Sequence, residues 1–209
     1  MSHPQSTCQV RAIIFDLGNV VLPFDHMRGC RAAARRSPLA PHEIYRRLFG
    51  ADLVDRFDRG HINGRTFFAE ARRLIDYHGP TGDLRRAWVE IFWSNPAMER
   101  LVHQLAGRVP LVLLSNVNRA HFQHVRRRYP IVRIFRRRVL SYEVGLLKPD
   151  PDIYRIAVSK AGCPATHCVY VDDKPDFARA AAAVGVTGLP FRGARRLRAD
   201  LKRLGVQAS

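Results

Sequence analysis

V-R-A-I-I-F-D-L-G-N-V-V-L, residues 10–22, is the stretch that decides the fold of this chain. Its first part, Val10–Phe15, is a mainly apolar run of strand length that is rich in β-branched residues. Such a run without alternation is typical of a strand buried on both faces of a parallel sheet. The run ends in a carboxylate, Asp16. Because ligands bind beyond the carboxyl ends of strands in open α/β sheets, Asp16 is a candidate nucleophile or metal ligand. The alternative is that it only ends the strand or caps a turn.

The composition is that of an ordinary globular protein. The chain has 209 residues, of which 46% are hydrophobic and 25% charged, enough for one core and a small inserted domain. No apolar run approaches the ~20 residues of a membrane span, so we expect no membrane partner. Residues 1–9 lack the apolar segment of a signal peptide, and we interpret them as a short disordered lead-in.

The spacing of the four cysteines suggests neither zinc nor a disulfide framework, which favours a reducing, cytoplasmic location. They are Cys8, Cys30, Cys163 and Cys168.

The net charge is unusually high, at +17, and nearly all of it comes from arginine. Two runs, Arg126–Arg128 and Arg136–Arg138, are compatible with nucleic-acid binding. The alternative is an arginine-biased composition spread over solvated helix faces. Because the arginines are scattered along the whole chain, we favour the second interpretation and do not expect a nucleic-acid partner. The sequence leaves the oligomeric state open.

The order of the predicted elements indicates an α/β fold with an insertion. Residues 23–95 contain only amphipathic helical patterns, and βα alternation resumes after them. This alternation predicts a Rossmann-like parallel sheet with helices on both faces. We therefore expect an α/β core domain formed by residues 1–22 and 96–209. A small helical cap domain, residues 23–95, is inserted after the first strand.

Polar side chains follow three of the predicted strands. Asp16 follows the first, Ser115-Asn116 the second, and Asp172-Asp173 a later one, while Lys148 lies in a loop. Each residue alone has a structural explanation, as a cap or a surface charge. The carboxyl ends of parallel strands meet at one edge, however, so together they suit phosphoryl transfer. Asp16 would attack phosphorus, Ser115 and Lys148 would hold phosphoryl oxygens, and a divalent ion such as Mg²⁺ would neutralise charge.

These motifs resemble those of the haloacid dehalogenase-like hydrolase superfamily. They are F-D-L-G-N-V at 15–20, L-S-N at 114–116, G-L-L-K-P-D-P at 145–151 and V-D-D-K-P at 171–175. The resemblance covers nearly the whole chain, including a helical cap between the first two motifs. The D-L-G-N-V form is closest to a subgroup that resembles a bacterial phosphatase acting on glucose 1-phosphate.

The resemblance implies a set of metal ligands and a cofactor. Asp16 would be both nucleophile and Mg²⁺ ligand, and the backbone carbonyl of Gly18 would also bind the ion. Asp173 fits the remaining ligand position best, with Asp172 beside it or also bound. The implied function is a Mg²⁺-dependent phosphatase of small phosphorylated metabolites, such as sugar phosphates, that forms an aspartyl-phosphate intermediate.

The resemblance also implies the phosphate-binding residues. Ser115 and Asn116 would bind the phosphate, and Lys148 would pair with Asp16 and the phosphoryl group. Two positions depart from the family pattern. Gly18 replaces the aspartate that serves as general acid and base, a loss that typically lowers the rate by ~10²–10⁴. Phe177 stands where the family often has a polar residue.

Other residues and functions stay open at this point. Asp25 is the nearest later carboxylate that could replace the missing acid, but a helix N-cap is its more probable role. His121 and His124 lie three residues apart on a predicted helix, where they either point at the site or, as we expect, lie on a surface helix face. One alternative function is a metal-independent 2-haloacid dehalogenase, against which the pair Asp172-Asp173 argues. Another is a weakly catalytic protein on the same fold that binds anions or nucleic acid, which a salt-sensitive affinity without turnover would favour.

Overall fold

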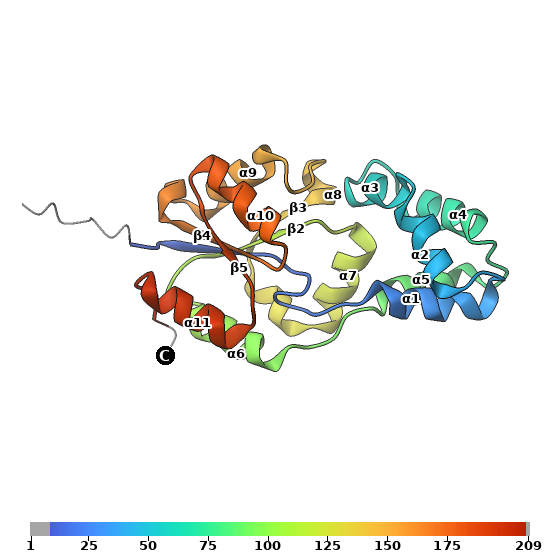
Figure 1. The fold of residues 1–209 in the computed structure, drawn as a ribbon, viewed down its shortest axis with the longest axis horizontal. Helices are drawn as coiled ribbons and strands as arrows, with labels where there is room; N and C mark the ends of the chain where they lie inside the picture. The colour runs from blue at the N-terminus through green and yellow to red at the C-terminus, as the bar shows by residue number, and fades with distance from the viewer. Residues whose placement is uncertain (1–8, 208–209) are drawn as a thin grey trace, which may run out of the picture.

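The computed structural model describes residues 9–207, so nearly all of the predicted disordered lead-in lies outside the described residues. Five parallel strands form one sheet in the order β3-β2-β1-β4-β5 (Figure 1). They are β1 (Ala12–Phe15), β2 (Leu111–Ser115), β3 (Arg137–Leu140), β4 (Cys168–Asp172) and β5 (Thr187–Pro190). The predicted parallel α/β fold is confirmed.

Strand β1 lies at the centre of the sheet because it is apolar on both faces. Its four residues are at most 2% exposed. Phe15 pairs with Leu113 on one side and with Val171 on the other. Asp16 follows directly and donates its backbone N–H to the Val171 carbonyl at 2.9 Å. The register therefore places Asp16 at the middle of the carboxyl edge of the sheet.

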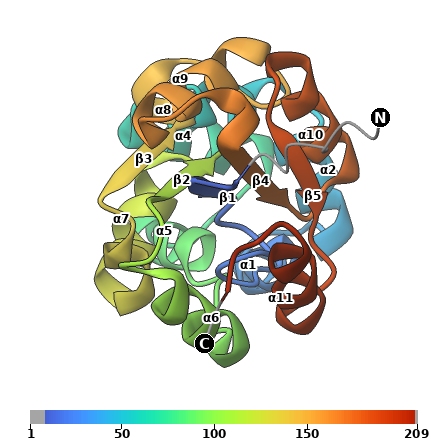
Figure 2. The ribbon, with the colours of Figure 1, turned by 90° about the vertical axis from the view of Figure 1, so that its left-hand side faces the viewer.

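Helices cover both faces of the sheet (Figure 2). One face packs against α6 (Pro96–Leu105), α7 (Arg119–Arg128) and α11 (Ala194–Arg203), through residues such as Leu101 and Leu201. The other face packs against α9 (Pro151–Ala161) and α10 (Pro175–Ala180). Short elements complete the core: α8 (Ser141–Val144), η2 (Pro130–Ile134), η3 (Ala165–His167) and η4 (Ala181–Val184). No helix of the described part of the chain is long and apolar enough to cross a bilayer.

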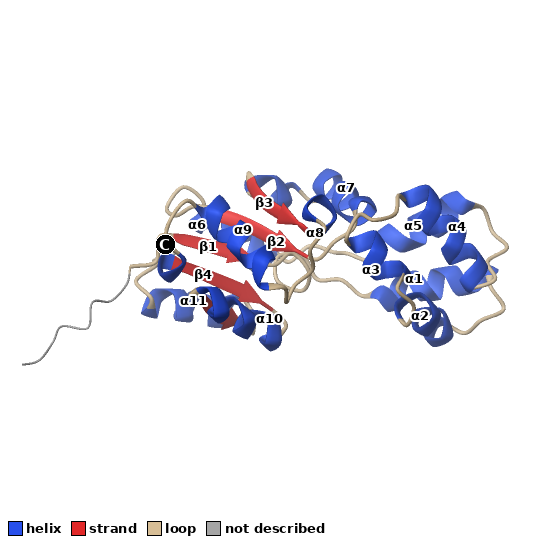
Figure 3. Cartoon of the chain, turned by 90° about the horizontal axis from the view of Figure 1, so that it is seen from above, coloured by secondary structure: helices blue, strands red, loops and turns tan. Residues whose placement is uncertain are grey.

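The insertion forms a separate layer beyond the carboxyl ends of the strands (Figure 3). It consists of α1 (His26–Ala33), η1 (Ala34–Arg36), α2 (Pro41–Phe49), α3 (Leu53–Asp58), α4 (Gly64–Leu74) and α5 (Thr81–Val89). These helices bury an apolar cluster of their own, in which Ile44, Phe67, Phe68 and Ile75 are at most 1% exposed. We call this layer the cap.

The two chain segments that join the cap to the core run side by side. The Trp93 N–H donates to the Pro23 carbonyl, and the Asp25 N–H donates to the Ile91 carbonyl, each at 3.1 Å. The Asp25 side chain accepts a hydrogen bond from the Met27 N–H at 2.8 Å and so caps α1. Asp25 therefore has the N-cap role that its sequence position favours.

Candidate active site

The carboxylates predicted to bind metal come together at the carboxyl edge of the sheet. Oxygens of Asp16, Asp172 and Asp173 lie within 4.8 Å of one another. Asp16 and Asp172 are buried, and Asp173 is partly buried. They extend from the ends of β1 and β4, which are neighbours in the sheet. The convergence of strand ends thus produces the predicted cluster.

Lys148 is the cation of this cluster. Its Nζ lies 2.9 Å from Asp16 Oδ1 and 2.7 Å from Asp172 Oδ2, and it donates to the Tyr170 hydroxyl at 2.9 Å. The ring of Phe177 lies 5.2 Å from the same nitrogen, so this departure from the family pattern supplies an aromatic face to the ammonium. Burial opposes the charged amine, but the two carboxylates outweigh it and raise the pKa of Lys148.

The charge balance of the cluster favours a divalent cation. Three carboxylates face one buried ammonium, and burial raises the pKa of Asp16 to about 7 against the lowering effect of Lys148. A carboxylate-rich site with oxygen donors is what Mg²⁺ prefers in proteins. The residues present therefore fit the predicted ion.

The two adjacent aspartates of the cluster have different surroundings. Asp172 accepts hydrogen bonds on both oxygens: Oδ1 from the Lys174 N–H at 2.8 Å, and Oδ2 from Lys148 and the Tyr170 hydroxyl. Asp173 is less enclosed, and burial together with the charge of Asp172 raises its pKa. This arrangement gives Asp172 the task of holding Lys148 and leaves Asp173 as the better candidate ligand.

Ser115 and Asn116 follow β2 and line the same cavity as Asp16. The Ser115 side chain makes only a long contact, 3.5 Å, to the Asn116 carbonyl. The Asn116 amide, in contrast, is engaged with the backbone of Lys148, accepting from its N–H at 2.8 Å and donating to its carbonyl at 3.1 Å. Ser115 is thus placed to bind a phosphoryl oxygen, whereas the Asn116 side chain positions the loop that carries Lys148.

The structure gives a steric reason for Gly18. A Cβ atom at this position would lie 2.5 Å from Cε1 of Phe24. The turn is fixed by Asn19, whose backbone has a φ of 54° and whose side chain accepts from the Phe24 N–H at 3.1 Å. The ring of Phe24 therefore occupies the space of the missing acid.

An aromatic wall closes the cavity above these residues. The cavity has a volume of about 130 Å³, and its lining includes Phe24, His26, Phe49 and Trp88 from the cap and its connections. The ring centroids of His26 and Phe49 are 4.5 Å apart. Burial lowers the pKa of His26 to about 4, so this ring is neutral near pH 7. The cap thus provides an aromatic surface next to the position expected for the alcohol part of a phosphate ester.

His121 lines the cavity that holds Asp16, so the expected surface position is wrong and the alternative, a position facing the site, is confirmed. The residue is 5% exposed and stacks on Trp88 with ring centroids 4.9 Å apart. Its Nε2–H donates to the Trp88 carbonyl at 2.8 Å, and burial lowers its pKa to about 3. The reason is that the cap covers this face of α7, which the helical pattern alone does not reveal. His124 is partly buried.

Asp58, at the end of α3, is a site residue that the sequence analysis missed. Asp58 lines the same cavity as Asp16, and its Oδ1 accepts from Asn118 Nδ2 at 2.9 Å. Within residues 9–207, no cation forms an ion pair with Asp58, and burial raises its pKa to about 7. Only the packing of the cap on the core brings it here, through Ser141 Oγ donating to the Asp58 carbonyl at 2.6 Å and Arg59 to the Gly145 carbonyl at 3.1 Å.

Solved structures share this fold. A predicted HAD-like hydrolase from Porphyromonas gingivalis superposes with a TM-score of 0.81, at 21% identity, covering 95% of this chain and 100% of the other. A HAD family enzyme from Bacteroides thetaiotaomicron, in complex with magnesium and inorganic phosphate, gives a TM-score of 0.75 at 21% identity, covering 85% and 92% of the two chains.

Curated relatives match the sequence over different lengths. Flavin mononucleotide hydrolase 1 of Arabidopsis thaliana is 37% identical over 65 residues, which are 31% of this chain and 26% of that protein, so the chain spans only about a quarter of its length. The sesquiterpene phosphatase astK of Aspergillus oryzae is 22% identical over 204 residues, covering 93% and 96% of the two chains.

The sequence model of the haloacid dehalogenase-like hydrolases matches residues 10–185. The resemblance to the glucose 1-phosphate phosphatase subgroup stays a prediction, but the chain belongs to the haloacid dehalogenase-like hydrolase family.

Proposed function

We propose that this protein is a magnesium-dependent phosphatase that hydrolyses phosphate monoesters of small metabolites, with Asp16 as the nucleophile. The observation that carries the proposal is the pairing of Asp16 with buried Lys148, at 2.9 Å, in an enclosed cavity that also holds Ser115 and Asp173. The names of two relatives, a flavin mononucleotide hydrolase and a sesquiterpene phosphatase, support phosphate ester hydrolysis.

Asp16, the Gly18 carbonyl and Asp173 would hold the magnesium ion, with Asp172 behind them. When bound, the ion neutralises the negative charge shared by these carboxylates and the substrate phosphate. The magnesium and phosphate bound by the Bacteroides thetaiotaomicron relative support this assignment.

In the first step, a carboxylate oxygen of Asp16 attacks phosphorus, and the bond between phosphorus and the ester oxygen breaks. Lys148 and Ser115 hold phosphoryl oxygens, and the charge of Lys148 also favours the ionised form of Asp16. The departing ester oxygen takes a proton from Asp58 and leaves as an alcohol. In the second step, ionised Asp58 removes a proton from water, the water oxygen attacks phosphorus, and Asp16 and phosphate separate.

Asp58 is assigned the proton transfer because of three observations. Gly18 provides no carboxyl group, and Asp25 is engaged in capping α1 and in an ion pair with Arg31 at 2.9 Å. Asp58 lines the cavity, and among residues 9–207 only one of its two carboxyl oxygens accepts a hydrogen bond. A pKa of about 7 keeps both protonation states accessible near neutral pH, as a general acid and base requires.

The aromatic residues that the cap places around the cavity favour a substrate whose phosphate is attached to a ring-shaped or apolar group. Pockets for small ligands commonly measure ~300–1,000 Å³, so a cavity of about 130 Å³ is a closed state that must open to admit a substrate. The wall formed by His26, Phe49 and Trp88 provides ring faces, and the Trp88 Nε1–H has no hydrogen-bond partner among the described residues. Sugar phosphates, whose rings present C–H faces, are our first candidates, and phosphate esters of flat or apolar groups come next.

The proposal is tested by phosphate release from a panel of sugar, nucleotide, prenyl and aryl phosphates, with Mg²⁺ and with EDTA. We expect turnover of at least one class that EDTA abolishes, and no turnover by Asp16→Asn. Full activity in EDTA, together with halide release from 2-chloropropionate, would instead establish the metal-independent dehalogenase. No turnover of any ester by folded, magnesium-loaded protein would contradict the proposal.

A further inference from the structure

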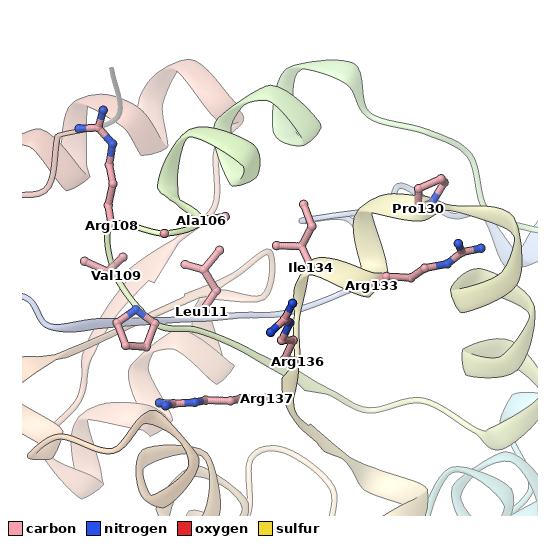
Figure 4. Close-up of a pocket in the computed structure, with 11 residues that line it drawn as sticks. Ala106, Arg108, Val109, Leu111, Pro130, Arg133, Ile134, Arg136 and Arg137 are labelled. Carbon is pink, nitrogen blue, oxygen red and sulfur yellow. The ribbon is translucent and has the colours of Figure 1, made fainter.

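A large, open hollow of the described surface lies away from the catalytic cavity. It measures about 800 Å³ and is lined by Arg133, Arg136 and Arg137 (Figure 4). These side chains come from η2 and from the start of β3, and Arg108 joins them from the loop after α6. This hollow and the cavity that holds Asp16 share no lining residue.

Two further hollows continue from the first along α7. The next, about 440 Å³, shares Arg133 with it and adds Arg126 and Arg127. The third, about 270 Å³, shares Arg127 with the second and reaches Arg65 and Arg119 at the edge of the cap. Nine arginines line the three hollows, and we call six of them the arginine track: Arg65, Arg119, Arg126, Arg127, Arg133 and Arg136.

Among the described residues, the track has no acidic neighbours in the three hollows. No Asp or Glu lines any of the three hollows, and no track arginine forms an ion pair with a described acidic residue. Several arginines outside the track are paired with acids, as in Arg31–Asp25, Arg155–Asp152 and Arg179–Asp176. Six arginines without an ion pair to a described acid therefore lie along one line, although other arginines without such a pair, for example Arg73 and Arg195, lie elsewhere.

The local structure holds parts of this track in place. Positions 119, 123, 126 and 127 recur with helical spacing on one face of α7, while His121 and Val125 are buried on another. Arg133 donates to the carbonyls of Arg126 and Arg127, both at 3.1 Å, and so fixes its guanidinium across the end of the helix. Fixed guanidinium groups bind phosphate in a bidentate manner with little loss of side-chain entropy.

We propose that the arginine track binds the phosphate backbone of a nucleic acid, as a site separate from the catalytic cavity. A row of unpaired guanidinium groups across adjoining hollows suits a ligand with repeated phosphates. No exposed aromatic residue lines the track, so bases have no stacking surface and binding is independent of base sequence. The exposed large apolar side chains of the described residues, Tyr45 and Trp93, do not line these hollows, which disfavours insertion into a lipid surface.

The test uses two full-length variants with the same change in net charge. One replaces four track arginines by glutamine: Arg65, Arg126, Arg127 and Arg136. The control replaces four exposed, ion-paired arginines elsewhere: Arg31, Arg46, Arg155 and Arg179. Fluorescence anisotropy with labelled oligouridylate is measured at several salt concentrations, and circular dichroism and hydrolysis of p-nitrophenyl phosphate show that each variant is folded.

We expect native protein and control variant to bind the RNA with similar affinities, within about threefold at a given salt concentration. The track variant should bind at least about tenfold more weakly, and its plot of log K against log salt should be shallower by about 0.7 for each phosphate contact removed. Equal losses in both variants would show that net charge alone attracts the RNA and would overturn the proposal. Absence of native binding near physiological salt would do the same. So would track-dependent binding to phosphatidylserine vesicles without binding to RNA.

Discussion

Replacing Asp58 with Asn tests the assigned proton transfer most sharply. The variant keeps the size of the side chain and an oxygen that accepts from Asn118, but it has no proton to give. Loss of a general acid typically lowers the rate by ~10²–10⁴, or about 3–5 kcal/mol of transition-state stabilisation. We expect this full loss for alkyl phosphates, whose departing oxygen needs a proton, and a loss below about tenfold for p-nitrophenyl phosphate, whose leaving group is stable as an anion.

The assay is kcat/KM for both ester classes across pH 5 to 9. Because protonated Asp58 is the acid of the first step and its pKa is about 7, native activity on alkyl phosphates should fall as pH rises through that value. The falling limb should be absent in Asp58→Asn.

A control separates this role from simple docking of the cap. Ser141→Ala removes the hydrogen bond to the Asp58 carbonyl but leaves the carboxyl group. It should affect both ester classes alike. If Asp58→Asn also lowers both classes equally, or leaves the leaving-group dependence unchanged, the reasoning is refuted and Asp25→Asn becomes the next variant.

The pKa of Asp58 also has a consequence for stability. The native state binds this proton more tightly than the unfolded chain does, since burial raises the pKa from 3.8 to about 7. The contribution of Asp58 to the free energy of unfolding is therefore lost as pH rises from 3.8 to about 7. At 1.36 kcal/mol for each unit of pKa shift, this loss is at most about 4 kcal/mol. Urea unfolding should show Asp58→Asn gaining stability relative to the native protein from pH 5 to pH 8. A constant difference would contradict the raised pKa.

Three further predictions concern the cluster and the cap. Lys148→Met should reduce the free energy of unfolding by about 3–5 kcal/mol, because two buried carboxylates lose their cation, and Asp172→Asn should restore part of it in urea denaturation. Gly18→Asp should lower both activity and Tm because its Cβ meets the ring of Phe24, and adding Phe24→Ala should relieve the loss; an unchanged Tm would refute this steric account. Phe49→Ala should shift kcat/KM by about tenfold or more toward bulkier esters with a smaller effect on p-nitrophenyl phosphate, whereas an unchanged profile would mean that the cap wall does not select substrates.

The sequence predicts the site residues that directly follow strands. It does not predict the site residues that the packing of the cap on the core brings to the cavity. Apolar runs locate β1 and β4, and parallel topology then places Asp16 and Asp172 together, since strand ends share one edge. Asp58 and His121 carry no such signal. Their positions depend on how the cap rests on α7 and α8, and helical periodicity says nothing of that contact.

The sequence also does not predict which of two adjacent polar residues binds the substrate and which one positions a loop. Nothing in the S-N pair distinguishes Ser115, which faces the cavity, from Asn116, whose amide holds the Lys148 backbone. The same limit applies to the arginines. Their scatter along the chain favours a compositional origin, and only the structure shows that six of them line adjoining hollows beside α7.

Formation of a phosphoryl group on Asp16 is the central claim. The most direct measurement is rapid acid quenching during turnover, followed by mass spectrometry of the proteolytic peptide that contains residues 12–22. We predict a fraction of this peptide heavier by one phosphoryl group in the native protein, and neither the heavier peptide nor turnover in Asp16→Asn. Phosphate release by Asp16→Asn at a near-native rate, or native turnover with the phosphoryl group on another residue, would contradict the account.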